Sequence, residues 1–206
     1  MSAKDGETAP AAAPRKAEVS RITKETDIEL ALALDGRGQI SVRTGLGFYD
    51  HMLTSWATHG GFDLQLQCEG DLHVDDHHTV EDCALALGEA LDTALGDRRD
   101  IERFGDALVP MDEALARAAV DLVRRPYAVV HLGFKRPQIG QVATEMLTHA
   151  LQSLTVAGRF TMHVDVLRGD NDHHRAEAAF KASARALRAA VRPRAGAGAP
   201  STKGVM

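Results

Sequence analysis

The residues best suited to chemistry are two histidine pairs, each followed three residues later by a glutamate, at positions 77–81 and 173–177. Imidazole and carboxylate groups are ordinary ligands of divalent transition metals. On a helix, the glutamate shares a face with either histidine of its motif. Adjacent histidines point about 100° apart, so each pair should serve two metal ions, or a metal ion and a substrate. The matched motifs predict a metalloenzyme.

A longer internal repeat surrounds these motifs. Residues 51–56 align with residues 149–154, His with His, Leu with Leu and Ser with Ser, and the ungapped alignment continues to Phe62 and Phe160. We interpret this as an internal duplication. Each half then adds one histidine, which gives two metal ions with four protein ligands each and open positions for a substrate. The predicted ligands are His51, His77, His78, Glu81, His149, His173, His174 and Glu177.

Length and composition restrict the class of protein. The chain has 206 residues, with 24 basic and 29 acidic side chains, and no basic block predicts a nucleic-acid or membrane partner. It contains neither an apolar run long enough to span a bilayer nor a secretory signal. The two cysteines cannot form a disulfide framework. We therefore expect a soluble, cytoplasmic protein in a reducing compartment.

Hydrophobic periodicity predicts an α+β fold of two repeated halves, at about 18–100 and 101–192, each with two helices packed on one face of a sheet. The first half should open with a three-strand meander that ends at 39–43. Strands at 62–68 and 160–167 should each lie between two helices, at 49–58 and 77–95, then 142–157 and 173–191. Asp75 or Asp76, and Asn171 or Asp172, can cap the motif helices. Composition predicts a disordered extension at 1–17 and a flexible tail at 193–206 that can close over a ligand.

With these motifs in view, the sequence resembles the imidazoleglycerol-phosphate dehydratase family of histidine biosynthesis. The resemblance rests on residues 48–53, 75–82, 125–127 and 173–182 and covers about 18–203. It implies dehydration of D-erythro-imidazole glycerol phosphate to imidazole acetol phosphate and water. It also implies two Mn²⁺ ions per subunit, a homo-oligomer of 24 subunits and a duplicated α+β fold.

The resemblance also assigns roles to individual residues. It places the eight ligands around the two ions, although spacing leaves open which four surround which ion. Glu25, His77 and Glu177 are the implied catalytic residues, with Glu25 as the proton carrier. His51, His59 and His173 are implied to bind substrate together with Glu25 and His77. The implied phosphate-binding residues are Arg103, Arg125, Lys181, Ser201 and Lys203.

Two other functions remain as alternatives. A dinuclear metal hydrolase would use the same ligands to activate water for attack on a phosphate or an amide, and turnover of a generic phosphoester would support it. A non-catalytic, metal-dependent shell protein would need the ligands alone. Loss of Glu25, Arg103 or Lys181 should not affect such a shell.

Overall fold

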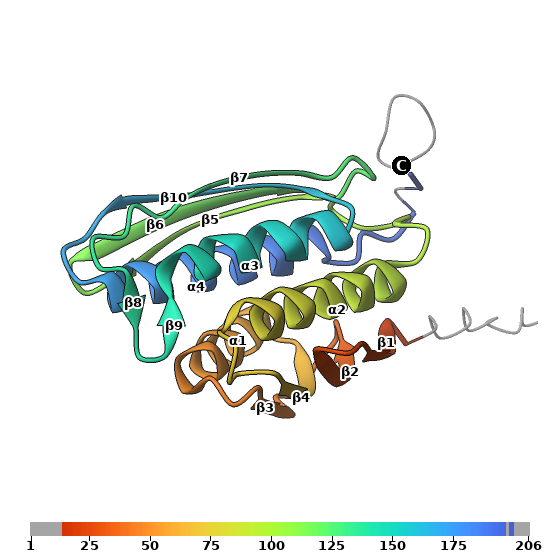
Figure 1. Ribbon diagram of the computed structural model, residues 1–206. Helices are drawn as coiled ribbons and strands as arrows, with labels where there is room; N and C mark the ends of the chain where they lie inside the picture. Colours follow the sequence, from red (N-terminus) through yellow and green to blue (C-terminus); the bar gives the residue numbers. More distant parts are fainter. Residues whose placement is uncertain (1–13, 197, 200–206) are drawn as a thin grey trace, which may run out of the picture.

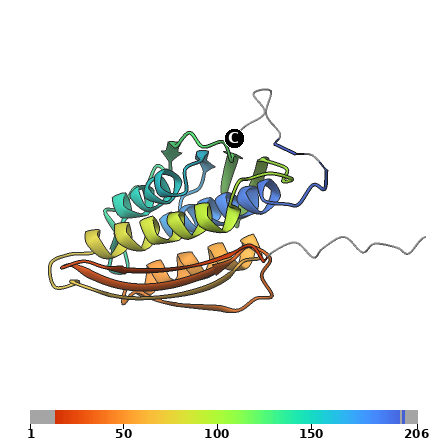
Figure 2. The ribbon, with the colours of Figure 1, turned by 90° about the vertical axis from the view of Figure 1, so that its right-hand side faces the viewer.

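The computed structural model describes residues 14–196 and 198–199. Within that part of the chain, two four-stranded sheets form the outer layers and four long helices lie between them (Figures 1 and 2). Two helices pack on the inner face of each sheet, as the sequence predicts. The two halves also have equivalent strand orders, which confirms the predicted α+β duplication.

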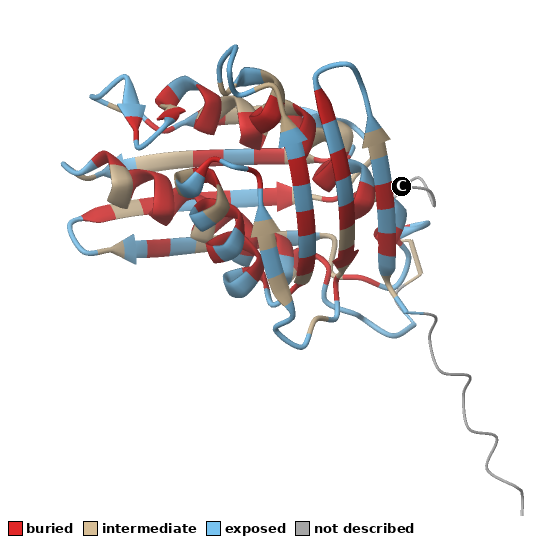
Figure 3. Ribbon diagram, turned by 60° about the horizontal axis from the view of Figure 1, so that its bottom comes forward, coloured by how far each residue is buried: buried red, intermediate tan, exposed pale blue. Residues whose placement is uncertain are grey.

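The first half runs from β1 (Lys16–Ile22) through β2 (Thr26–Ala33), β3 (Ile40–Arg43), α1 (Gly47–Gly60) and β4 (Asp63–Gly70) to α2 (His77–Leu95). Its sheet has the order β1-β2-β4-β3. Alternate residues of β2, namely Ile28, Leu30 and Leu32, are buried against the helices, as period-two alternation requires. The same alternation is visible along the neighbouring strands in Figure 3.

The second half repeats this arrangement. It contains β5 (Phe104–Met111), β6 (Ala114–Asp121), β7 (Tyr127–His131), α3 (Thr144–Ala157), β10 (Thr161–Arg168) and α4 (Asp172–Ala190). The sheet order is β5-β6-β10-β7, in which β7 pairs with β10 in parallel and β6 pairs with β10 antiparallel. A short hairpin of β8 (Gln138–Ile139) and β9 (Val142–Ala143) precedes α3. Hydrophobic periodicity does not reveal this hairpin, because each of its strands has two residues.

Three expectations from the sequence are wrong in detail. The first half does not open with a meander, because β3 pairs in parallel with β4 and does not return along β2. The folded part begins before residue 18, since β1 starts at Lys16 and the buried Ala17 pairs with Leu32. The tail from 193 is anchored at its start, because Pro193 bridges Ile101 and residues 194 and 198 donate backbone hydrogen bonds to Asp100.

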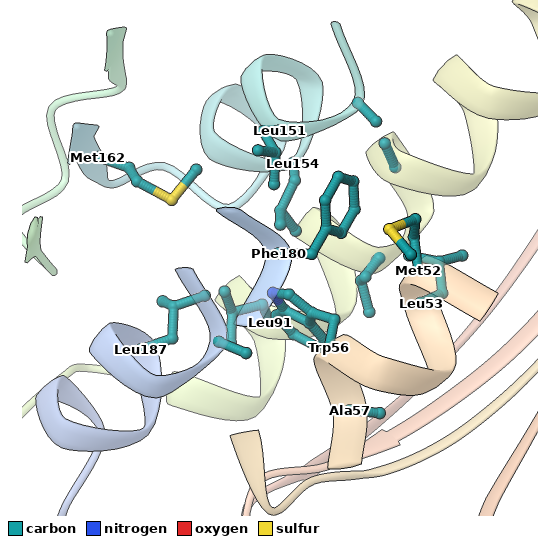
Figure 4. Packing of buried hydrophobic residues seen from close by; sticks show 14 of the residues in the cluster. Met52, Leu53, Trp56, Ala57, Leu91, Leu151, Leu154, Met162, Phe180 and Leu187 are labelled. Carbon is teal, nitrogen blue, oxygen red and sulfur yellow. The ribbon is translucent and has the colours of Figure 1, made fainter. Parts of the chain in front are cut away.

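The core lies where the helices of the two halves meet. Trp56 of α1, Leu91 of α2, Leu154 of α3 and Phe180 of α4 are almost completely buried there (Figure 4). Gly88 allows α2 to approach α3 closely, because an added Cβ would lie 2.6 Å from the carbonyl oxygen of Leu154. This close packing of α2 on α3 sets the separation of the histidines and glutamates that the two helices carry.

Candidate metal centres

The first candidate metal centre lies between α1 and α4. One ligand atom from each of His51, His173 and Glu177 falls within 4.8 Å of the other two. The Nε2 atoms of His51 and His173 lie 3.5 and 3.3 Å from Oε2 of Glu177. Ligands that sit about 2.1 Å from an ion are separated by roughly 4.2 Å at most. Small side-chain rotations would therefore bring all three donors onto one ion.

The second candidate centre has the same composition and lies between α2 and α3. It consists of His77, Glu81 and His149, with ligand atoms again within 4.8 Å of one another. Oε1 of Glu81 is 2.7 Å from Nε2 of His149, and Oε2 is 3.8 Å from Nε2 of His77. Because histidine and glutamate are four residues apart on α2, they point from one face of the helix.

Each centre combines ligands from both halves of the chain. The first takes His51 from the first half and the other two ligands from α4, whereas the second takes His149 from the second half and the other two from α2. The repeat predicted the ligand set but not this exchange between halves. Two neutral imidazoles and one carboxylate suit a divalent ion with open coordination positions.

The charge of Glu177 is stabilised by its neighbours. Burial would raise the pKa of this carboxyl, but Nζ of Lys181 lies 2.7 Å from Oε1 and His51 lies beside it, so the pKa falls below its ordinary value. Oε1 therefore faces the ammonium group while Oε2 faces the two histidines. The carboxylate is ionised at neutral pH, as a metal ligand must be.

The remaining two predicted ligands, His78 and His174, lie outside both centres. Nδ1 of His78 is 3.0 Å from Oδ2 of Asp71, and Nδ1 of His174 is 2.7 Å from Oε2 of Glu113. These carboxylates raise the pKa of both histidines. The separation of adjacent histidines agrees with the expected 100° offset around each helix. Each pair serves two locations, as its spacing predicts.

Glu25 lies close to one of these outer histidines. It occupies the turn between β1 and β2, where its Oε1 atom is 3.6 Å from Nε2 of His78. The turn is fixed by the Thr23 hydroxyl, which accepts the backbone N–H groups of Glu25 and Thr26. The proposed proton carrier is therefore held beside a predicted metal ligand.

Asp71 and Glu113 were not among the predicted site residues. Asp71 follows β4, and Glu113 lies in the turn between β5 and β6, far along the chain from its histidine. The predicted cap of α4 is confirmed, since Asn171 accepts the N–H of His173. At α2, the N-cap residue Asp76 makes no side-chain cap hydrogen bond, and Asp75 before it accepts the N–H of His77. Both missed carboxylates lie at strand ends, which is the only sequence signal that could have drawn attention to them.

Two of the predicted substrate-binding residues lie near the first centre. Lys181 is one helical turn beyond Glu177, and His59 occupies the last turn of α1. Burial lowers the pKa of His59, and the positive charges of Lys181 and Arg185 lower it further. His59 is therefore a predominantly neutral imidazole beside two cations at neutral pH.

Of the other predicted phosphate residues, Arg103 and Arg125 are not brought to this location within one chain. Arg103 donates its backbone N–H to Ala190, at the far end of α4, and its guanidinium forms two hydrogen bonds with Asp121. Glu177 lies thirteen residues before Ala190, so the rise of an α-helix separates them by about 20 Å. Arg125 is exposed just beyond β6. Ser201 and Lys203 lie outside the described residues.

Comparisons with known proteins identify one family. The family model described as Imidazoleglycerol-phosphate dehydratase matches residues 44–187. A Candida glabrata protein of that name is 55% identical over 207 residues, covering 91% of this chain and 98% of its own. One from Phytophthora nicotianae is 58% identical across 93% of this chain, which spans 42% of that relative. The crystal structure of IGPD from Pyrococcus furiosus matches with a TM-score of 0.80 and 38% identity, covering 91% and 100% of the two chains.

Proposed function

The chain belongs to the imidazoleglycerol-phosphate dehydratase family and is a hydro-lyase, and we propose that it dehydrates D-erythro-imidazole glycerol phosphate to imidazole acetol phosphate and water in histidine biosynthesis. The observation that carries this proposal is the pair of His-His-Glu centres, each assembled from both halves. The free, buried cysteines Cys68 and Cys83 suit the reducing cytoplasm. Among the described residues, no helix is long and apolar enough to cross a membrane.

The donor atoms support two Mn²⁺ ions per subunit. Each centre supplies two imidazoles and one carboxylate, leaving room for a further protein ligand and for substrate on an octahedral ion. His78 and His174 lie outside both centres of their own chain, with Nδ1 already directed to a carboxylate. We propose that their Nε2 atoms complete the centres of neighbouring copies. Metal binding would then join subunits into the homo-oligomer of 24 copies that we propose.

The reaction removes a hydroxyl and a proton from adjacent carbons, with no carbonyl to acidify that proton. Divalent ions would be held by His51, His173 and Glu177 in the first centre and by His77, Glu81 and His149 in the second. Such ions would supply Lewis acidity to the imidazole ring of the substrate. His51, His77 and His173 would orient that ring. Glu25 accepts the carbon-bound proton, since it is a carboxylate outside both centres and beside His78. The resulting enol becomes the ketone when its other carbon is protonated.

The cations support recognition of the substrate's phosphate. Lys181 and His59 lie near the first centre, whereas Arg103 and Arg125 lie near the other end of α4. Nine residues of α4, about 14 Å of helix rise, separate Lys181 from Ala190, whose carbonyl accepts the backbone N–H of Arg103 in the same copy. We propose that two copies contribute to each phosphate site, together with Ser201 and Lys203. Guanidinium and ammonium groups converging on a dianion would form the charge-assisted contacts that phosphate binding requires.

The proposal is tested with purified full-length protein, Mn²⁺ and D-erythro-imidazole glycerol phosphate. We expect mass spectrometry to show loss of one water and formation of the ketone. Glu81→Gln should abolish turnover, whereas Glu29→Gln, which removes a carboxylate charge on the exposed face of β2, should leave turnover unchanged. Release of inorganic phosphate without dehydration would favour the dinuclear hydrolase instead.

A further inference from the structure

His78 and His174, which lie outside the three-ligand centres, each have a carboxylate against Nδ1, and the ligand set does not explain these carboxylates. Asp71 contacts Nδ1 of His78 with both oxygens, at 3.2 and 3.0 Å. Glu113 contacts Nδ1 of His174 at 2.7 Å. The two carboxylates come from different places in the two halves, one following a strand and the other in a turn between strands. The same contact has therefore been built with different residues.

Backbone hydrogen bonds anchor both residues. Oε1 of Glu113 accepts the backbone N–H groups of Asp170 and Asn171, immediately before α4 begins. Its other oxygen is thereby aimed at His174, two residues into that helix. The backbone N–H of Asp71 donates to the carbonyl of Glu25, which links the Asp71 backbone to the turn between β1 and β2. The carboxylate of Glu113 is therefore fixed directly, and Asp71 is fixed through its backbone.

We propose that Asp71 and Glu113 are positioning residues that fix His78 and His174 as the tautomer protonated at Nδ1, which leaves Nε2 unprotonated to bind a divalent ion. An ionised carboxylate can only accept a hydrogen bond, so it selects the ring form that donates from Nδ1. The lone pair of the neutral ring is then on Nε2, where a metal can bind. This inference rests on the proposed role of both histidines as ligands.

The contacts of Asp71 and Glu113 with the two histidines predict how amide substitutions should act. An amide can either donate to Nδ1 or accept from it, so Asp71→Asn and Glu113→Gln preserve shape but remove the choice of tautomer. Glutamine can still accept the backbone N–H groups before α4, which keeps the helix start in place. A purely structural carboxylate would tolerate this exchange. A carboxylate that orients a metal ligand would not, because such partners typically change metal affinity about 10- to 100-fold.

The test titrates Mn²⁺ into metal-stripped full-length protein and counts bound ions by electron paramagnetic resonance. We expect Asp71→Asn and Glu113→Gln each to weaken part of the Mn²⁺ binding about 10- to 100-fold, with unchanged thermal unfolding of the metal-free protein. Asp165→Asn is the matched control, because that carboxylate also contacts a histidine Nδ1, at 3.2 Å on His131, away from both centres. It should leave Mn²⁺ binding unchanged.

Reference variants separate this inference from the function on which it rests. If His78→Ala and His174→Ala lose Mn²⁺ while both amide variants bind it like the parent, the positioning role is overturned and the ligand role stands. If the alanine variants also bind like the parent, the ligand role itself fails. Nitrogen-15 spectra of the metal-free protein give a second measurement: the parent should show Nδ1–H for both rings, and Glu113→Gln should lower the Nδ1–H population of His174 only.

Discussion

Replacing Lys181 by methionine should change metal binding and substrate binding in opposite directions. Its ammonium lies 2.7 Å from Oε1 of Glu177, with 15% and 10% of the two side chains exposed. An ion at the first centre needs that carboxylate and is repelled by the ammonium. Removing the positive charge should therefore tighten Mn²⁺ binding there. The same change removes a proposed phosphate contact and should weaken substrate binding.

The magnitude follows from the charged contact between Lys181 and Oε1 of Glu177, which an ion at Oε2 weakens by drawing on the same carboxylate. A hydrogen bond between charged groups contributes about 1.5 to 3 kcal/mol. Because the ion weakens this contact without replacing it, we take the lower end, which corresponds to about tenfold tighter Mn²⁺ binding at the first centre. The lost phosphate contact should raise KM about tenfold or more by the same conversion. Lys181→Arg, which keeps the charge, should change Mn²⁺ binding much less.

The second metal centre, which the internal repeat provides, serves as the control in this experiment. Leu85 lies four residues after Glu81 on α2, where α4 has Lys181 after Glu177. The second centre therefore has no cation at the position equivalent to Lys181, and Lys181→Met should leave its Mn²⁺ binding unchanged. Leu85→Lys should weaken binding at the second centre alone. Unchanged or weaker Mn²⁺ binding in Lys181→Met, measured by titration of the metal-free protein, would refute this account of the first centre.

Four further outcomes are expected. Glu25→Gln should lower turnover roughly a hundredfold or more without changing metal content. Chelation should split the assembly into smaller oligomers, seen as a lower sedimentation coefficient. Arg98→Met should cost about 3 kcal/mol in urea unfolding, because it breaks an ion pair in which the Arg98 side chain is fully buried and that of Asp92 is 21% exposed. The hydrogen bond with His174 holds the pKa of Glu113 at about 2, below its ordinary value of 4.5. The stabilising effect of this ionised carboxylate is present above pH 4.5 and lost as pH falls toward 2. The unfolding free energy of metal-free Glu113→Gln should therefore change less with pH between 4.5 and 2 than that of the parent.

Much of the site was predictable because its spacing is local. The four-residue separation of His77 from Glu81 and of His173 from Glu177 places each pair on one helical face, and the structure keeps both pairs together. The repeat also identified His51 and His149. What spacing could not supply was the partner of each pair, since that depends on how α1 packs against α4 and α2 against α3.

Residues whose roles depend on long-range contacts were harder to predict. Glu113 reaches His174 across 61 positions of sequence, and its own turn has no feature of a metal site. The parallel pairing of β3 with β4 was missed for a related reason, because residues 39–43 alternate equally well for either neighbour. Arg103 was placed in the phosphate group by resemblance alone, and its pairing with Asp121 at the far end of α4 is a tertiary feature.

The exchange of ligands between halves has a simple geometric explanation. If two identical half-chains packed about a two-fold axis, a histidine of the first helix in one would face the His and Glu of the second helix in the other, and symmetry would create two equal centres. The present chain has this arrangement within one molecule. Arg98 in the connecting segment then holds the halves together, since its guanidinium bonds Asp92 of one half and the carbonyls of Leu122 and Gly158 of the other. Neither half alone contains a complete three-ligand centre, so in this chain each centre depends on the packing of one half against the other.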